Sequence, residues 1–279
     1  MTLDELAEAA PFAGSAKVPP WTMGCFHRRS ITYASGEEDT GTQVVWVQSG
    51  GLTGDIRIPA DRPELGGRRS LADCSRDELA ALAEAEGGVA DTRFRRGRMS
   101  WDNWVSFQPY NKWPEPGDLR RVGGCLMEFA PSGAYVEDWR FQPGSEGLQV
   151  GLRLVSETGE DGVARPRDGG LVVAGEHVIQ VLGRRKALPT SEPAAQQIRA
   201  AADLAAVVAE VFDCEASYFR RDPGSVRCRV ELSTNPLLEG LTQSVLGDFR
   251  PGPRMGLLLQ QVSTAETTVE RMWRCSSGP

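Results

Sequence analysis

Histidine and clustered cysteine are scarce in this 279-residue chain, and their scarcity excludes several kinds of metal protein. The sequence has only two histidines, His27 and His177, so a zinc site made of three histidines cannot be built. The six cysteines are widely scattered, with no Cys-x-x-Cys pair and no Cys/His cluster. This spacing indicates neither a zinc site nor a disulfide framework. We therefore expect no metal and a reducing, cytoplasmic location.

Long apolar runs and the familiar cofactor motifs are also missing. No stretch reaches the roughly 18 consecutive apolar residues that span a bilayer, and the acidic segment Met1–Gly14 does not resemble a signal peptide. The sequence has no Gly-x-Ser-x-Gly elbow, no phosphate-binding loop and no dinucleotide-binding glycine motif. Its 31 basic and 38 acidic residues give a net charge of −7. We therefore expect no cofactor, and neither nucleic acid nor a membrane as the main partner.

What the chain does contain is a series of short β-strand patterns, punctuated by 31 glycines and 18 prolines. The clearest alternation lies in Val226–Ser233, where valine, cysteine, valine and leucine occupy one face and charged or polar residues the other. The predicted strands are Phe26–Tyr33, Gln43–Gln48, Thr53–Pro59, Val89–Arg95, Met99–Phe107, Asp118–Phe129, Ala134–Phe141, Leu148–Ser156, Leu171–Leu182, Phe212–Arg220, Val226–Ser233, Met255–Val262 and Thr267–Arg274.

Only two helices are predicted. Ser75 and Glu78 form a capping box for a short helix that runs to Gly87. A longer helix starts at the Ser191–Pro193 signal and continues to about Val211, with one apolar stripe at helical spacing. So many strands and so few helices favour a closed barrel, because closure removes exposed sheet edges.

The predicted fold is therefore all-β: an antiparallel lipocalin-like β-barrel, or two packed barrels, with two short helical inserts. We expect residues 1–20 to form an N-terminal arm, a short helix or a frayed segment. Residues 21–279 would form the lipocalin-like β domain. A turn at residues 143–147, rich in glycine, marks a candidate split within it.

Short motifs in the chain resemble a known family. They are Arg28–Ile31, Val45–Gln48, Asp55–Pro59, Tyr135–Trp139, Leu171–His177 and Asp213–Ser217, the last leading toward Ser233–Pro236. Together they are similar to the HRI1-like, lipocalin-like β-barrel proteins, over roughly Trp21 to Ser233. The resemblance implies a lipocalin-like barrel with an internal cavity, and it supplies no catalytic residues.

Asp55 and Arg57 are the first candidate pair for chemistry inside such a barrel. Strand geometry places them on one face and Ile56 and Ile58 on the other. If the isoleucines pack outward against the long helix, the Asp–Arg pair faces the lumen, where Arg57 could orient a carboxylate, enolate or carbonyl oxygen. The alternative is a structural or surface ion pair.

A second candidate set lies on the hairpin around residues 126–139. Tyr135, Glu137 and Trp139 share one face, and Glu128 precedes them across a turn. Two glutamates and a phenol could supply an acid, a base and a hydrogen-bond donor. A cavity lined by Trp139 with Trp46 and Trp101 would raise a glutamate pKa by desolvation. The alternative is that Glu137 pairs with Arg140 or Arg153 on a solvated sheet face.

His177 is the most conspicuous single residue, because it falls among apolar residues of the predicted strand Leu171–Leu182. It is interpreted either as a core histidine satisfied by a carbonyl or carboxylate, or as a general base near neutral pH. A third reading makes it an axial ligand of haem.

The function predicted from these residues is a cofactor-independent enzyme of the lyase, isomerase or cyclase type. It would act on a small apolar or amphipathic molecule in the barrel cavity. Glu137, His177, Arg57, Tyr135 and Asp55 are the candidate catalytic residues. Trp46, Trp101, Glu128 and Trp139 are the candidate ligand-binding residues. The alternative is a non-catalytic lipocalin-like carrier of the same ligand, with haem binding as a further option, and a homodimer stays open.

Overall fold

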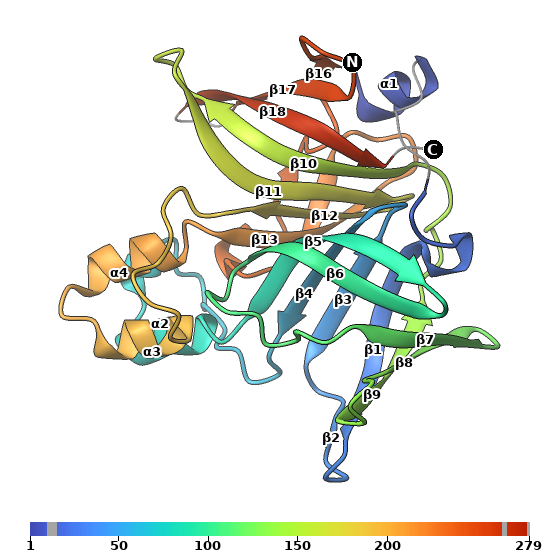
Figure 1. Ribbon diagram of the computed structural model, residues 1–279. Coiled ribbons are helices and arrows are strands. Elements are labelled where there is room, and N and C mark those ends of the chain that lie inside the picture. The colour runs from blue at the N-terminus through green and yellow to red at the C-terminus, as the bar shows by residue number, and fades with distance from the viewer. Residues whose placement is uncertain (10–15, 264–266, 278–279) are drawn as a thin grey trace.

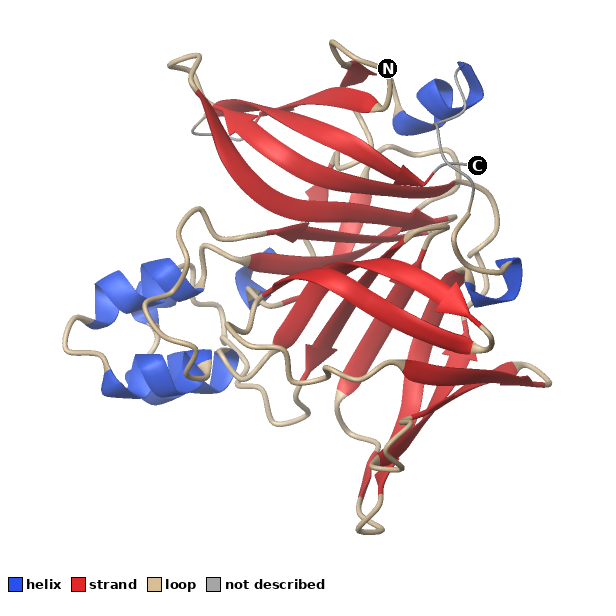
Figure 2. Cartoon of the chain, in the orientation of Figure 1, coloured by secondary structure: helices blue, strands red, loops and turns tan. Residues whose placement is uncertain are grey.

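Two antiparallel sheets follow one another along the chain and pack against each other (Figures 1 and 2). They are seen in a computed structural model that describes residues 1–9, 16–263 and 267–277. The strands of the first sheet are β1 (Gly24–Tyr33), β2 (Glu38–Asp39), β3 (Gln43–Gln48), β4 (Leu52–Ile58), β5 (Glu86–Arg95), β6 (Arg98–Ser106), β7 (Gly117–Val122), β8 (Cys125–Phe129) and β9 (Tyr135–Phe141).

The first sheet is a closed barrel, because β1 pairs with both β3 and β9. The barrel strands are β1 and β3 to β9. The two-residue β2 pairs with Ile31 and Thr32 of β1. The predicted antiparallel lipocalin-like barrel is therefore confirmed for this half of the chain.

The second sheet is curled but open. Its strands are β10 (Gln149–Thr158), β11 (Ala164–Ala174), β12 (His177–Leu182), β13 (Glu215–Arg221), β14 (Cys228–Ser233), β15 (Thr242–Gln243), β16 (Phe249–Pro251), β17 (Leu257–Ser263) and β18 (Thr268–Ser277). The order is β15-β14-β13-β12-β11-β10-β18-β17-β16, and no pairing within the described chain joins its two ends. The chain therefore contains one barrel and a half-barrel.

Two predicted strands are each a hairpin. Leu171–Leu182 turns at Gly175, whose φ is +60°, so that Ala174 pairs with His177. Asp118–Phe129 turns in the same way at Gly123, with Val122 opposite Cys125. The prediction of single strands was wrong because the residues on both sides of each turn have strand-forming patterns.

The helices are short and differ from the prediction. They are α1 (Leu3–Ala9), α2 (Arg76–Leu82), α3 (Ala194–Ala200) and α4 (Leu204–Val211), and single 3₁₀ turns occur at η1 (Pro20–Thr22), η2 (Leu71–Asp73) and η3 (Pro236–Leu238). The predicted long helix is broken, because Ala201 is extended and Asp203 caps the nitrogen of Ala206 to start α4. The capping box of Ser75 with Glu78 is present, but α2 ends at Leu82 and Gly87 belongs to β5.

The barrel and the half-barrel share an apolar interface. Ile56 of β4 is buried there in one cluster with Val172 and Ile179 of the second sheet. Glycines bring the two backbones close: a Cβ on Gly87 would lie 2.6 Å from the Cβ of Ala216. The second sheet therefore covers this part of the outer face of the barrel. The expectation that a helix covers Ile56 and Ile58 was wrong.

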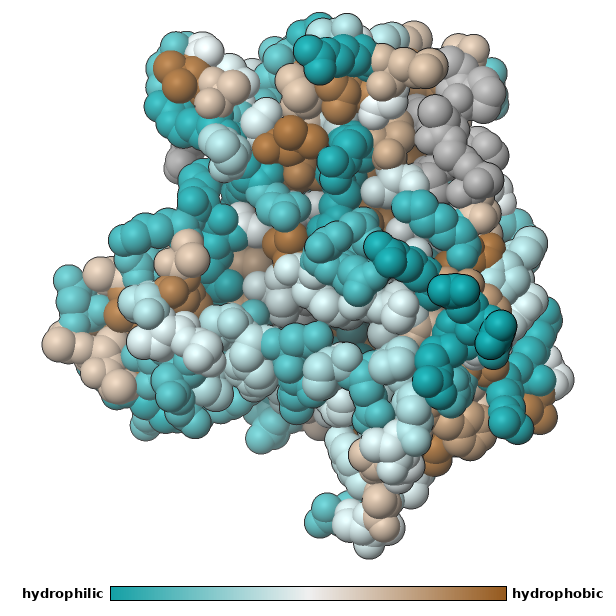
Figure 3. All heavy atoms as spheres, in the orientation of Figure 1, coloured by the Kyte–Doolittle hydropathy of each residue, from teal (hydrophilic) through white to brown (hydrophobic). Residues whose placement is uncertain are grey.

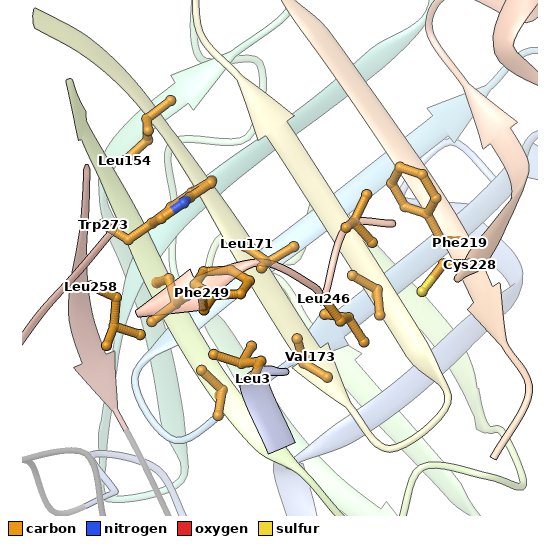
Figure 4. Close-up of a cluster of buried hydrophobic side chains, with 14 of the residues drawn as sticks. Leu3, Leu154, Leu171, Val173, Phe219, Cys228, Leu246, Phe249, Leu258 and Trp273 are labelled. Atoms are coloured by element: carbon orange, nitrogen blue, oxygen red, sulfur yellow. The ribbon is translucent and has the colours of Figure 1, made fainter. Parts of the chain in front are cut away.

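The concave face of the second sheet holds a second apolar core, which Figure 4 shows in close-up. Leu3 of α1, Leu246 and Phe249 fill it from the open side and contact Leu171 and Trp273 of the strands. The N-terminal helix thus packs on the half-barrel, while residues 10–15 of the predicted arm lie outside the described residues. Figure 1 places the N-terminus beside this sheet.

The barrel ends at Phe141 and the half-barrel begins at Gln149, so residues 143–147 connect the two sheets. Whether the two halves are separate domains stays a prediction. None of the helices in the described part of the chain is long and apolar enough to cross a bilayer. The face shown in Figure 3 is largely hydrophilic, with its apolar residues in scattered patches.

Candidate functional site

The lumen of the first barrel contains a cavity of about 640 Å³, within the size range of small-molecule sites. Its wall comes from strands β3 to β6, β8 and β9. Residues 108–113, and residues 187–191 from the second half of the chain, complete the lining of the cavity. We call the end of the cavity that these two segments form its mouth. Five of the seven tryptophans of the sequence line this cavity: Trp46, Trp101, Trp104, Trp113 and Trp139.

Period-2 alternation along β4 explains how polar groups enter the lumen. Asp55 and Arg57 line the cavity, while Ile56 and Ile58 point to the opposite face and are buried. Arg57 Nε donates to Asp55 Oδ2 at 2.9 Å, and its guanidinium lies 4.8 Å from the ring centre of Trp113. Arg57 is thus held from two sides.

Glu137 lies behind Arg57 and joins it to Arg28. Arg28 Nη1 donates to Glu137 Oε1 at 2.9 Å, and Arg57 Nη1 lies 3.5 Å from the same oxygen. Arg28 also donates to Asp39 at 2.6 Å. Glu137 is only 2% exposed and does not line the cavity. Its position is that of a counter-ion for two arginines, unlike the solvated pairing with Arg140 or Arg153 considered from the sequence.

A second ion pair, between Lys112 and Glu86, lies in the cavity wall near the mouth. Lys112 Nζ donates to Glu86 Oε1 at 2.6 Å, and the indole of Trp113 donates to Glu86 Oε2 at 2.9 Å. Burial acts to raise the pKa of Glu86, but Arg57 and Lys112 outweigh it and hold that pKa below its usual value. Burial raises the pKa of Asp55 despite the neighbouring Arg57.

Glu128 is the least satisfied acid of the lumen. Its side chain lines the cavity and is 4% exposed. The hydroxyl of Tyr135 lies 3.5 Å from its Oε1. The indole Nε1 of Trp139 makes no hydrogen bond in the described structure, but Trp139 also acts to lower the pKa of Glu128. Gly117 of β7 leaves room for it, because a Cβ there would lie 2.7 Å from Glu128 Oε1. Burial, and then the charge of Glu137, raise the pKa of Glu128 to about 8.

Glu128 is thus a carboxylic acid that keeps its proton at neutral pH. It faces an aromatic cavity and lies next to a phenol whose own pKa is raised, first by burial and then by Glu128. A group of this kind can donate a proton to a bound molecule.

The structure brings most of the sequence-predicted residues together. The cavity wall includes Asp55, Arg57, Tyr135, Trp46, Trp101, Glu128 and Trp139. Glu137 is adjacent through Arg57, but His177 does not reach the lumen. It begins β12, in a separate cavity between the two sheets that also contains His27 and Arg220.

Both ring nitrogens of His177 are already engaged. Nδ1 lies 2.8 Å from the hydroxyl of Tyr218, and Nε2 lies 3.0 Å from the carbonyl of Pro143 and 2.7 Å from Arg220. Burial lowers the pKa of His177 to about 4. These contacts match the core-histidine interpretation, and they leave no free nitrogen for a haem iron. Across the described part of the chain, no group of three or more His, Cys, Asp or Glu side chains is placed to hold a metal ion.

Sequence reasoning did not identify Arg28, Glu86 or Lys112 as parts of the site. Glu86 directly precedes Gly87 and was assigned to the end of a helix; ending that helix at Leu82 would have placed it in a strand. Arg57 and Glu86 are in fact paired residues of β4 and β5. The segment 187–191 comes from the second half of the chain, and nothing in its local sequence indicates that it borders the barrel mouth.

No family model, curated protein or solved structure matches this chain. The candidate site therefore rests on its own geometry.

The raised pKa of Glu128 predicts a pH dependence of stability. The unfolded glutamate has a pKa near 4.5 and the folded one about 8, so from pH 5 to 8 only the unfolded state releases this proton. The free energy of unfolding should therefore fall by about 1 kcal/mol for each pH unit in this window. Glu128→Gln should remove this decline, and urea unfolding at pH 5, 6 and 7 measures it.

The matched control for this experiment is Glu160→Gln, because Glu160 is exposed in the turn before β11. It should follow the wild-type pH profile. Parallel profiles for wild type and Glu128→Gln would show that Glu128 ionises normally in the folded protein.

Proposed function

We propose that this chain is a cofactor-independent enzyme that transfers a proton to a small, mostly apolar molecule held in the barrel lumen. The observation that carries the proposal is Glu128, a buried acid with a pKa of about 8 on the wall of an aromatic cavity. Lyase, isomerase and cyclase reactions can each use such a step.

The surroundings of Glu128 favour its action as a general acid. Its O–H bond breaks as a bond from the proton to the substrate forms, which leaves a carboxylate and positive charge on the substrate. Indole faces stabilise positive charge, and Trp139 and Tyr135 lie beside the carboxyl group. The carboxylate then takes a proton from another atom of the substrate, which removes the positive charge and restores the acid.

Arg57 has a different role in this proposal from the one that the sequence suggested. Its charge is already met by Asp55 at 2.9 Å and Glu137 at 3.5 Å. It therefore has little capacity to stabilise an enolate, and it serves to hold Asp55, Glu137 and Trp113 in place.

The alternative function is a carrier that binds the same molecule without changing it, since the same cavity serves both. Membership of the HRI1-like, lipocalin-like family is also a proposal, supported by the motifs from Arg28–Ile31 to Ser233–Pro236 and by the barrel. A cytoplasmic location is a further proposal, with which the six free cysteines agree. A homodimer stays a proposal with no observation behind it.

Deuterium exchange distinguishes the enzyme from the carrier. The molecule retained by the full chain is identified by native mass spectrometry and incubated with the protein in D₂O. We expect the wild type to introduce deuterium at a carbon or into the product. Glu128→Gln should slow this exchange at least ~100-fold with little change in affinity, and Glu160→Gln should not slow it.

Two results would contradict the proposal. A tightly bound molecule that no form of the protein labels would identify a carrier. Equal labelling by wild type and Glu128→Gln would show that another group transfers the proton.

A further inference from the structure

The positive groups of the cavity wall already have partners. Arg57 is paired with Asp55 and Glu137, and Lys112 is paired with Glu86. Arg184, which borders the mouth, donates to the backbone carbonyls of Ser106, Phe107, Glu210 and Val211. An anionic ligand would lose its hydration, while the lumen cations Arg57 and Lys112 already face carboxylates.

Among the acids of the described cavity wall, Glu128 is the one without a cationic partner within ion-pair distance. Four groups affect its charge: Glu137 raises its pKa, and Arg57, Trp139 and Tyr135 lower it. None of them is a cation in direct contact, because Arg57 directs its guanidinium to Asp55 and Glu137. The carboxyl group is more than nine-tenths buried and lines the cavity. A cation placed beside it would supply the missing counter-charge.

The aromatic residues of the lumen favour the same kind of ligand. Indole is the side chain that binds cations most strongly through its ring face, and five of the seven tryptophans are in this wall. Arg57 already uses this attraction against Trp113. Trp139 packs edge-on against Trp46, and both of these side chains are almost fully buried. A flat apolar body held in the cavity would contact these aromatic walls.

We infer that the barrel lumen binds an organic cation, namely a nitrogen base with a flat apolar body whose ammonium group lies between Glu128 and the indole faces. This inference rests on the proposed function, because a cation beside the Glu128 carboxylate reproduces the charges that proton transfer to the substrate creates; the ligand class that it names is that of the protonated substrate. Glu128 loses its proton when the cation binds: the proton leaves for solvent, and the carboxylate pairs with the ammonium group.

Three probes with one ring system test the charge of the ligand. They are 2-(2-naphthyl)ethylamine, which is a cation at neutral pH, 2-(2-naphthyl)ethanol, which is neutral, and 2-naphthylacetate, which is an anion. Isothermal titration calorimetry at pH 7 and 8 gives their affinities. We expect the amine to bind at least ~10-fold more tightly than the alcohol, and the anion to bind most weakly.

Proton release gives a second, independent readout. Titrations of the amine in buffers of different ionisation enthalpy should show that nearly one proton leaves at pH 7, and that affinity rises from pH 7 to 8. Glu128→Gln should release none and should lose the ~10-fold preference for the amine. Its affinity for the alcohol should stay close to that of the wild type. Glu160→Gln should behave as the wild type does.

The outcomes separate this inference from the proposed function. If the alcohol or the anion binds as tightly as the amine, the cation inference is wrong, and proton transfer to a neutral molecule stands. If none of the three binds at millimolar concentration, the cation inference is also wrong, and the deuterium experiment alone decides the proposed function.

Discussion

Val230→Asp is expected to destabilise the protein by more than about 4 kcal/mol, a large part of the stability of a typical domain. Val230 is 1% exposed and belongs to the apolar core on the concave face of the second sheet. Its neighbours there include Phe219 and Cys228, and Phe219 is its partner on β13. An aspartate at this position would bury a charge with no partner.

Thermal unfolding measures this effect, and the midpoint should fall by about 10 °C or more. Arg229→Asp is the matched control, because it places the same side chain one residue away on the exposed face of β14. We expect only a small change for the control. An unchanged midpoint for Val230→Asp would mean that β14 does not pack as described.

Glu157→Gln is expected to cost about 3 kcal/mol, because it removes the anion that two buried arginines share. Arg167 Nη1 donates to Glu157 Oε2 at 2.6 Å, and Arg271 Nε donates to Oε1 at 2.9 Å. The more exposed Arg185 also reaches Oε2, at 3.1 Å. Burial acts to raise the pKa of Glu157, but Arg167 and Arg271 outweigh it and keep that pKa below its usual value.

Asp161→Asn provides the comparison for Glu157→Gln. Asp161 forms a bidentate pair with Arg165 in the same hairpin, but both side chains are about half exposed. Solvent screens such a pair, so denaturant unfolding should show little change for this variant. Equal midpoints for Glu157→Gln and the wild type would indicate that solvent reaches the arginines around Glu157.

The sequence was informative where one face of a strand is polar and the other apolar. In β4, the alternation of Asp55, Ile56, Arg57 and Ile58 was sufficient to predict which side chains share a face, and the structure shows that the face with Asp55 and Arg57 is the lumen. Prediction failed at the hairpin of β11 and β12, where most residues on both sides of Gly175 are buried. A strand that is buried on both faces has no alternation, and so its pattern does not locate a turn.

Only those parts of the candidate site that lie on one strand, or on two adjoining strands, could be predicted from the spacing of residues in the sequence. Tyr135 and Trp139 share a face of one strand, and Glu128 is on the adjoining strand, opposite Glu137. The partners of Glu137 could not be predicted, because Arg28 is 109 residues away and contacts it only through the closure of β1 on β9. His177 is a candidate from the sequence because it falls among apolar residues of a predicted strand, whereas its position between the two sheets depends on the packing of the whole chain.

The pairing of β10 with β18 has a consequence for the timing of folding during synthesis. Every strand of the first barrel lies before Gln142, so the barrel can close while the ribosome is still translating the second half. By contrast, β10 must wait for β18, which begins 110 residues after β10 ends. At ordinary translation rates this interval is roughly 5 to 20 s. Meanwhile one edge of β10 stays unpaired, and the apolar face around Leu152 is open to wrong partners or to chaperones.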